Sequence, residues 1–262
     1  MSSEKQIEFN KENLDYYLKE VAKEYRKLVG KKMPAELILI GGASVLINYS
    51  FRAMTTDIDA LIFASSAIND AIGRVRDRFG LPGDWLNADF MKTESYTSKL
   101  LQYSVYYQTY SNVLSIRTVS AEYLIAMKLR SGRLYKHDMS DVLGILAEHK
   151  QRGVVISKEQ VLKAVSDLYG STDVLPETSV FFLDNVMENG NFAKMYEMVS
   201  SNEKESRDYL IHFDKKYPGV VNGSTIPDII LSQQKKNSES ILGMLIQKRD
   251  DNKNRSKGDE RD

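Results

Sequence analysis

Two aspartates separated by one residue, Asp57 and Asp59, are the residues of this sequence best suited to metal chemistry. They flank Ile58 at the start of the apolar stretch 57–63, which predicts a buried strand. Residues two apart on a strand point to the same face, so both carboxylates should project together while Ile58 packs inward. Carboxylate oxygens are ligands for Mg²⁺ or Mn²⁺, and two charges beside a core need such a compensating cation. We therefore expect Asp57 and Asp59 to be catalytic residues and metal ligands.

A glycine pair precedes the two aspartates and suits phosphate binding. The apolar stretch 36–40 predicts a strand, Gly41 and Gly42 end it, and residues 43–49 then read as a helix. Glycine lets the backbone approach a ligand, and a helix N-terminus offers unpaired N–H groups to an anion. Ser44 could add a hydroxyl, so Gly41, Gly42 and Ser44 are predicted nucleotide-binding residues. The competing interpretation is that the aspartates merely face solvent or cap a turn, because the acid-x-acid spacing also occurs by chance.

A third carboxylate is harder to assign. Asp89 is a possible further metal ligand, although a carboxylate in a loop is more often simply solvated. The two strands expected within residues 100–110 and 113–119 contain neither Asp nor Glu. The metal site could therefore be incomplete or built differently.

Basic residues gather where one predicted helix ends and the next begins. Lys128 follows an apolar helical face, and Arg130 and Arg133 lie near its end, so a triphosphate could be neutralised there. Asp138 and Asp141 are three residues apart and share a face of the next helix. The structural alternative is that these charges pair locally and that Asp138 caps a helix.

The glycine pair and the Asp-apolar-Asp strand together resemble the signature of the DNA polymerase β-like nucleotidyltransferases. The basic segment is similar to the later motifs of the abortive-infection branch of that superfamily, which includes toxins of toxin–antitoxin systems. This resemblance implies that Lys128 and Asp138 take part in nucleotide binding and catalysis, with Asp138 as a possible base. The later motifs are compressed here, and many members have a serine where this chain has Gly42.

The remaining pattern predicts an α/β (α+β) fold with a mixed sheet flanked by helices, followed by an all-helical C-terminal region. Sheet residues end near position 119, and helical spacing dominates afterwards. Residues 249–262 carry no large apolar side chain and are expected to be disordered. We predict a nucleotidyltransferase core over 1–150, a helical domain over 151–248 and this tail.

Composition excludes several classes of site and partner. The chain has 262 residues, no cysteine and 36 basic against 36 acidic side chains. Thiolate zinc sites and disulfides are therefore excluded, and no global basic field indicates nucleic acid. No apolar stretch approaches the length of a membrane span, which favours a cytoplasmic protein without membrane contact.

The expected function is transfer of a nucleoside monophosphate from a nucleoside triphosphate to an acceptor hydroxyl with Mg²⁺. The acceptor could be tRNA, a protein or a small molecule, and a cognate antitoxin or toxin could be a partner. The competing hypotheses are a catalytically incomplete binding or antitoxin-like module of the same fold, and a helical interaction protein whose match is accidental.

Overall fold

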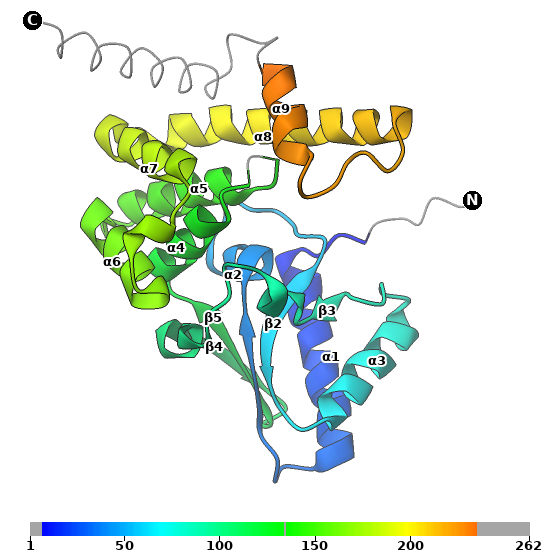
Figure 1. Cartoon of the computed structure of the whole chain (residues 1–262). Helices are drawn as coiled ribbons and strands as arrows, with labels where there is room; N and C mark the ends of the chain where they lie inside the picture. The colour runs from blue at the N-terminus through cyan, green and yellow to red at the C-terminus, as the bar shows by residue number, and fades with distance from the viewer. Residues whose placement is uncertain (1–6, 134, 235–262) are drawn as a thin grey trace, which may run out of the picture.

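Five strands form one mixed sheet in the order β3-β2-β1-β5-β4. In the computed structural model, which describes residues 7–133 and 135–234, helices lie on both sides of this sheet (Figure 1). β1 is antiparallel to β2 and parallel to β5, while β2 is parallel to β3 and β4 is antiparallel to β5. The strands are β1 Ala35–Leu39, β2 Ile58–Phe63, β3 Leu86–Asn87, β4 Ser104–Tyr110 and β5 Leu114–Val119.

Helices occupy most of the rest of the described chain, as the spacing of apolar residues predicts. Residues 100–103, expected to begin a strand, instead belong to the 3₁₀ segment Ser98–Tyr103, which leads into β4. The α-helices are α1 Lys11–Val29, α2 Gly41–Asn48, α3 Ala67–Phe79, α4 Ala121–Ser131, α5 Asp138–Gln151, α6 Lys158–Tyr169, α7 Glu177–Asn189, α8 Phe192–Lys216 and α9 Ile226–Gln234. Three 3₁₀ segments are η1 Asp89–Lys92, η2 Ser98–Tyr103 and η3 Thr172–Val174.

Local sequence signals account for several of these boundaries. Asn10 caps α1 through a reciprocal bond pair with Asn13, and the predicted capping box of Ser157 with Gln160 opens α6. The hairpin between β4 and β5 turns at residues 111–112, both of which have positive φ. These signals act over a few residues, so they can be recognised in the sequence.

The sheet separates two apolar clusters because successive residues of a strand face opposite sides. On β1, Leu37 and Leu39 pack with α1 and α3, whereas Ile38 packs with α4 and α5. Figure 1 shows α1 and α3 on one side of the sheet and α4 to α7 on the other. The prediction of a mixed sheet flanked by helices is confirmed.

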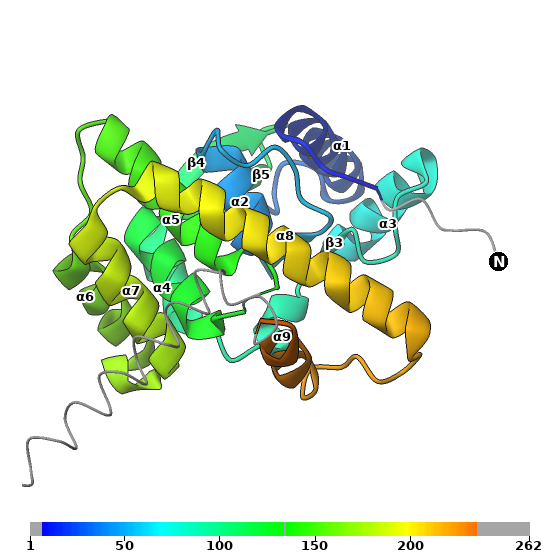
Figure 2. The same cartoon turned by 90° about the horizontal axis from the view of Figure 1, so that it is seen from above.

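Helix α8 crosses over α5, as the view from above shows (Figure 2). The apolar cluster on the α4 side extends from Ile38 in β1 to Val199 in α8, so it passes the boundary predicted near residue 150. The predicted tail 249–262 lies outside the described residues. Within the described part of the chain, every helix is too short or too polar to cross a membrane.

Candidate functional site

The aspartate pair lies where β2 begins. Ile58 is fully buried between the two, and its N–H donates to the carbonyl of Trp85 at 3.0 Å. The N–H of Ile40 donates to the carbonyl of Asp59 at 2.9 Å, which joins the end of β1 to the start of β2. Asp57 is exposed and Asp59 is half-buried, so both carboxylates sit at the edge of the sheet where α2 starts.

The negative charge of this pair is only partly neutralised by the protein. Burial, together with the neighbouring Asp57 carboxylate, raises the pKa of Asp59 to about 6. Lys136 and Arg133 oppose this rise through space. Within residues 7–133 and 135–234, neither carboxylate has a Lys or Arg nitrogen at ion-pair distance. The pair could therefore accept a cation.

The two glycines are the first turn of α2 instead of a turn ahead of it, and they serve different purposes. Gly41 has φ of +55°, and a Cβ added to it would lie 3.9 Å from Oδ2 of Asp59. A Cβ on Gly42 would lie 2.6 Å from Oγ1 of Thr55 and 3.0 Å from a guanidinium nitrogen of Arg52. Gly41 thus brings the N-terminus of α2 beside the carboxylate of Asp59, while Gly42 makes room for the segment that leads into β2.

Ser44 points into the protein. It is fully buried, and its Oγ accepts a hydrogen bond from the N–H of Val119 at 3.3 Å. In this arrangement the hydroxyl fastens α2 to the end of β5. Contact with a phosphate would require it to leave that position.

Asp89 lies near the aspartate pair but is paired elsewhere. It begins η1, two residues beyond Asn87, which is the register partner of Asp59. Its carboxylate forms an ion pair with Lys92 at 2.6 Å and is 62% exposed. Among the described side chains, no three Asp, Glu or His residues lie close enough to hold one metal ion. A metal ion bound to the two carboxylates would therefore take its other ligands from water or substrate oxygens.

Lys128 and Asp138 meet in a partly buried group of charges that we call the charge network: Arg52, Lys128, Arg133, Asp138 and Asp141. The ammonium of Lys128 lies 3.0 Å from Asp138 and 2.8 Å from Asp141. Arg133 Nε binds Asp138 at 2.8 Å, and Arg52 Nη1 binds Asp141 at 2.7 Å. Lys128 and Arg133 therefore pair with Asp138 close by in the sequence, as the structural alternative predicts, but the two aspartates are buried instead of solvated, and Asp138 is the first residue of α5 instead of its cap.

The charge network limits what Asp138 can do as a base. Its side chain is fully buried. Burial acts to raise the pKa of Asp138, but Lys128 and Arg133 outweigh it and hold that pKa well below its usual range. A carboxylate with such a low pKa accepts a proton poorly, so its contacts favour a role in holding Arg133.

The two other basic residues of this segment, Arg130 and Lys136, have different partners. Arg130 donates to the carbonyl of Val174 and pairs with Glu94 at 3.1 Å, away from the aspartates. Lys136 acts on both Asp57 and Asp59, and burial, followed by the charge of Arg133, lowers its pKa.

Arg52 is the member of the charge network that sequence reasoning missed. It lies in the connection between α2 and β2, which carries no motif. Its contacts with Asp141 bridge residues 89 positions apart.

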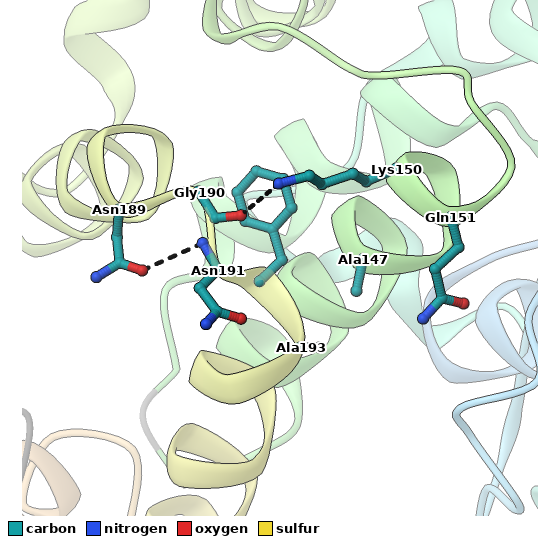
Figure 3. A pocket seen from close by; sticks show the side chains of 8 residues that line it. Ala147, Lys150, Gln151, Asn189, Gly190, Asn191 and Ala193 are labelled. Carbon is teal, nitrogen blue, oxygen red and sulfur yellow. Dashed lines mark hydrogen bonds between the residues drawn. The ribbon is translucent and has the colours of Figure 1, made fainter.

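The structure also has an open pocket at the end of α5, shown in Figure 3. Lys150 donates to the carbonyl of Gly190 there at 2.9 Å. None of the predicted site residues contributes to it. The pocket is lined by Ala147, Lys150, Gln151, Asn189, Gly190, Asn191, Phe192 and Ala193.

Comparison with protein families gives one match, which covers residues 16–148 and therefore just over half of the chain. The matched segment runs from α1 to α5 and includes the aspartate pair, the glycine pair and all five residues of the charge network. Comparison with curated proteins and with solved structures gives no significant match. The matching model is described as a nucleotidyltransferase of unknown function (DUF6036), and the chain belongs to that family.

Proposed function

We propose that this protein transfers a nucleoside monophosphate from a nucleoside triphosphate to an acceptor hydroxyl. The observation that carries the proposal is the placement of Asp57 and Asp59 beside the N-terminus of α2, within electrostatic reach of Arg133 and Lys136. Carboxylates for a cation thus lie next to N–H groups and cations for phosphates. Family membership supports the same reaction class.

Asp57 and Asp59 would hold Mg²⁺ or Mn²⁺. Two observations support the fit: the carboxylates have no cationic partner at ion-pair distance among the described residues, and the pKa of Asp59 is raised. Mg²⁺ commonly binds through one or two carboxylates and takes its other ligands from water and substrate phosphates. When bound, the ion would stabilise negative charge on the phosphate oxygens.

The remaining residues would bind and orient the nucleotide. The first N–H groups of α2, at Gly41 and Gly42, would donate to phosphate oxygens. Arg133 and Lys136 would neutralise the leaving pyrophosphate. Lys128 and Asp138 would act indirectly, by holding the guanidinium of Arg133 in place.

The acceptor defines the biological role. A tRNA, a protein side chain or a small molecule would each offer a hydroxyl, and the toxin–antitoxin hypothesis requires a macromolecular acceptor and a cognate partner protein. Equal numbers of acidic and basic residues give no general attraction to nucleic acid. A protein or a small molecule therefore fits this charge balance better than a large RNA surface does.

A second candidate is a nucleotide-binding module without turnover. It is favoured by the lack of a third carboxylate close to Asp57 and Asp59 in the described part of the chain. It predicts nucleotide affinity that depends on Mg²⁺, but no covalent transfer.

One experiment separates these functions. The protein is incubated with each of the four nucleoside triphosphates labelled at the α-phosphate, with MgCl₂ and cell extract, and labelled macromolecules and small products are separated. Label transfer that is lost in Asp57→Asn and Asp59→Asn, but kept in the exposed control Asp77→Asn, supports the transferase. Mg²⁺-dependent binding without transfer supports the binding module, and affinity that is indifferent to Mg²⁺ and to both substitutions contradicts the metal site.

A further inference from the structure

Glu203, on α8, is a buried carboxyl outside the segment matched by the family. It is 2% exposed and lies against the first turn of α5. Its Oε1 accepts from the N–H of Met139 at 3.0 Å and from that of Ser140 at 3.2 Å, and its Oε2 accepts from the Ser140 hydroxyl. The first N–H groups of a helix have no partner within the helix, and the N-cap residue His137 supplies no side-chain bond. Glu203 therefore caps α5 from another helix.

Helix α8 also contacts the connection between α4 and α5, whose described residues are 132, 133 and 135–137. Nη1 of Arg207, one turn beyond Glu203, lies 2.9 Å from Nε2 of His137. Tyr135 packs against the apolar cluster that Leu210 of α8 forms with α9. The end of the connection thus contacts α8, and its middle packs against the apolar cluster formed by α8 and α9.

The opposite end of the connection is held where α4 ends, at Gly132. Gly132 ends α4 with φ of +59°, and a Cβ there would lie 2.9 Å from Oγ of Ser179 in α7. Only glycine suits this conformation and this packing. With both ends held, the direction of Arg133 and Lys136 depends on where the first turn of α5 sits.

We propose that Glu203 is a positioning residue of the nucleotide site: by capping α5 from α8, it sets Arg133 and Lys136 against Asp57 and Asp59. Asp138 is the first residue of α5 and binds both Lys128 and Arg133, so a shift of that turn moves the guanidinium directly. Functional groups must be held within about 0.5 Å of their working geometry. This inference rests on the proposed function, and it makes the C-terminal helices part of the site.

The protonation state of Glu203 suggests which substitution would keep the cap. Burial raises the pKa of Glu203 to about 8. The hydrogen bonds from Ser140 oppose this rise, and the carboxylates of Asp141 and Asp138 add to it. At neutral pH the side chain is mostly a neutral acid, and Gln has nearly the same shape with an acceptor oxygen for the two N–H groups. The Ser140 hydroxyl can turn toward the carbonyl of His137, which lies 3.4 Å away. Glu203→Gln should thus preserve the cap, whereas Glu203→Ala removes it.

The test compares four variants of the full chain. Glu203→Ala and Glu203→Gln are set beside Glu205→Ala, an exposed residue of the same helix, and Val199→Ala, which loosens the packing of α8 without touching the cap. The dissociation constants of ATP, GTP, CTP and UTP are measured with MgCl₂. Hydrogen exchange of residues 135–140 is followed without nucleotide.

We expect Glu203→Ala to weaken Mg²⁺-dependent nucleotide binding by about 10- to 100-fold, the usual cost of losing a residue that orients site ligands. Exchange of residues 135–140 should quicken in the same variant. Glu203→Gln should stay within about threefold of the wild type, because its acceptor is retained. Glu205→Ala should match the wild type.

The outcomes separate the two inferences. If the wild type binds none of the four nucleotides, the proposed function fails, and the role of Glu203 at a nucleotide site fails with it. If the wild type binds but Glu203→Ala binds equally well, the positioning role alone is overturned. It is also overturned if Val199→Ala weakens binding as much, because general loosening of α8 would then suffice.

Discussion

Replacing Asp59 by Asn is expected to stabilise the metal-free protein at pH 7 while removing its response to Mg²⁺. The ionised carboxylate is half-buried next to Asp57, so the folded state disfavours its charge. Asn keeps the shape of the side chain and removes that charge. If Asp59 holds a metal ion as proposed, its carboxylate opposes folding until the metal is bound.

The magnitude follows from the pKa of Asp59. Its rise from 3.8 to about 6 corresponds to ~3 kcal/mol for the ionised group. Asp59 is partly exposed, and solvent screening reduces this figure, so we expect the free energy of unfolding to increase by ~1–2 kcal/mol in Asp59→Asn. The exposed control Asp77→Asn should change it by less than about 0.5 kcal/mol.

The increase in the free energy of unfolding of Asp59→Asn should itself increase with pH. Because the folded-state pKa is raised, the protonated carboxyl contributes stability below pH 3.8, and this contribution is lost as the pH rises to about 6. The stability difference between Asp59→Asn and the wild type should therefore be near zero below pH 3.8, grow up to about pH 6 and stay constant above it.

Urea denaturation in EDTA and in MgCl₂, from pH 3.5 to 8 where the protein stays folded, measures these quantities. Mg²⁺ should raise the free energy of unfolding of the wild type and of the Asp77→Asn control, but not that of Asp59→Asn. If Asp59→Asn is less stable than the wild type in EDTA at pH 7, the carboxylate has favourable contacts in the fold and the reasoning is refuted. A gain that is independent of pH would refute the electrostatic explanation.

Three other substitutions, together with the control Gly73→Ala, test the packing around the site by denaturant unfolding. Gly144→Ala should lower the free energy of unfolding by ~1–3 kcal/mol, because a Cβ would lie 2.5 Å from the ring of Phe51. The control Gly73→Ala, in a helix and with no atom within 4 Å of the new Cβ, should raise it by ~0.5–1 kcal/mol. Equal effects of the two substitutions would contradict this account. Lys128→Met should lower the free energy of unfolding by ~3–5 kcal/mol, because it leaves two buried carboxylates without the Lys128 ammonium. An unchanged free energy of unfolding would show that Arg52 and Arg133 are enough to neutralise these carboxylates. Ser44→Ala should lower the free energy of unfolding by ~1–2 kcal/mol, because its hydrogen bond to β5 is lost. Nucleotide affinity should stay unchanged. A large loss of affinity would instead show that the Ser44 hydroxyl contacts a phosphate.

The sequence by itself determined the features that depend on neighbouring residues. The apolar stretch 57–63 predicts the strand. Because strand geometry repeats every two residues, it also predicts that the two aspartates project on the same side. The helices follow from apolar spacing and capping residues in the same way. Asp57, Asp59 and the glycine pair could be selected on this basis alone.

Tertiary structure decided which of the selected groups face the aspartates. Arg130 and Lys128 have the same charge and lie two residues apart, yet one pairs with Glu94 and the other with the buried aspartates. Position 42 requires glycine because Thr55 and Arg52 pack against it. The first turn of α5 is capped by Glu203, which lies more than sixty residues away in the sequence. Such contacts depend on how distant elements pack, because burial forces each charge and each N–H group to find a partner wherever the fold supplies one.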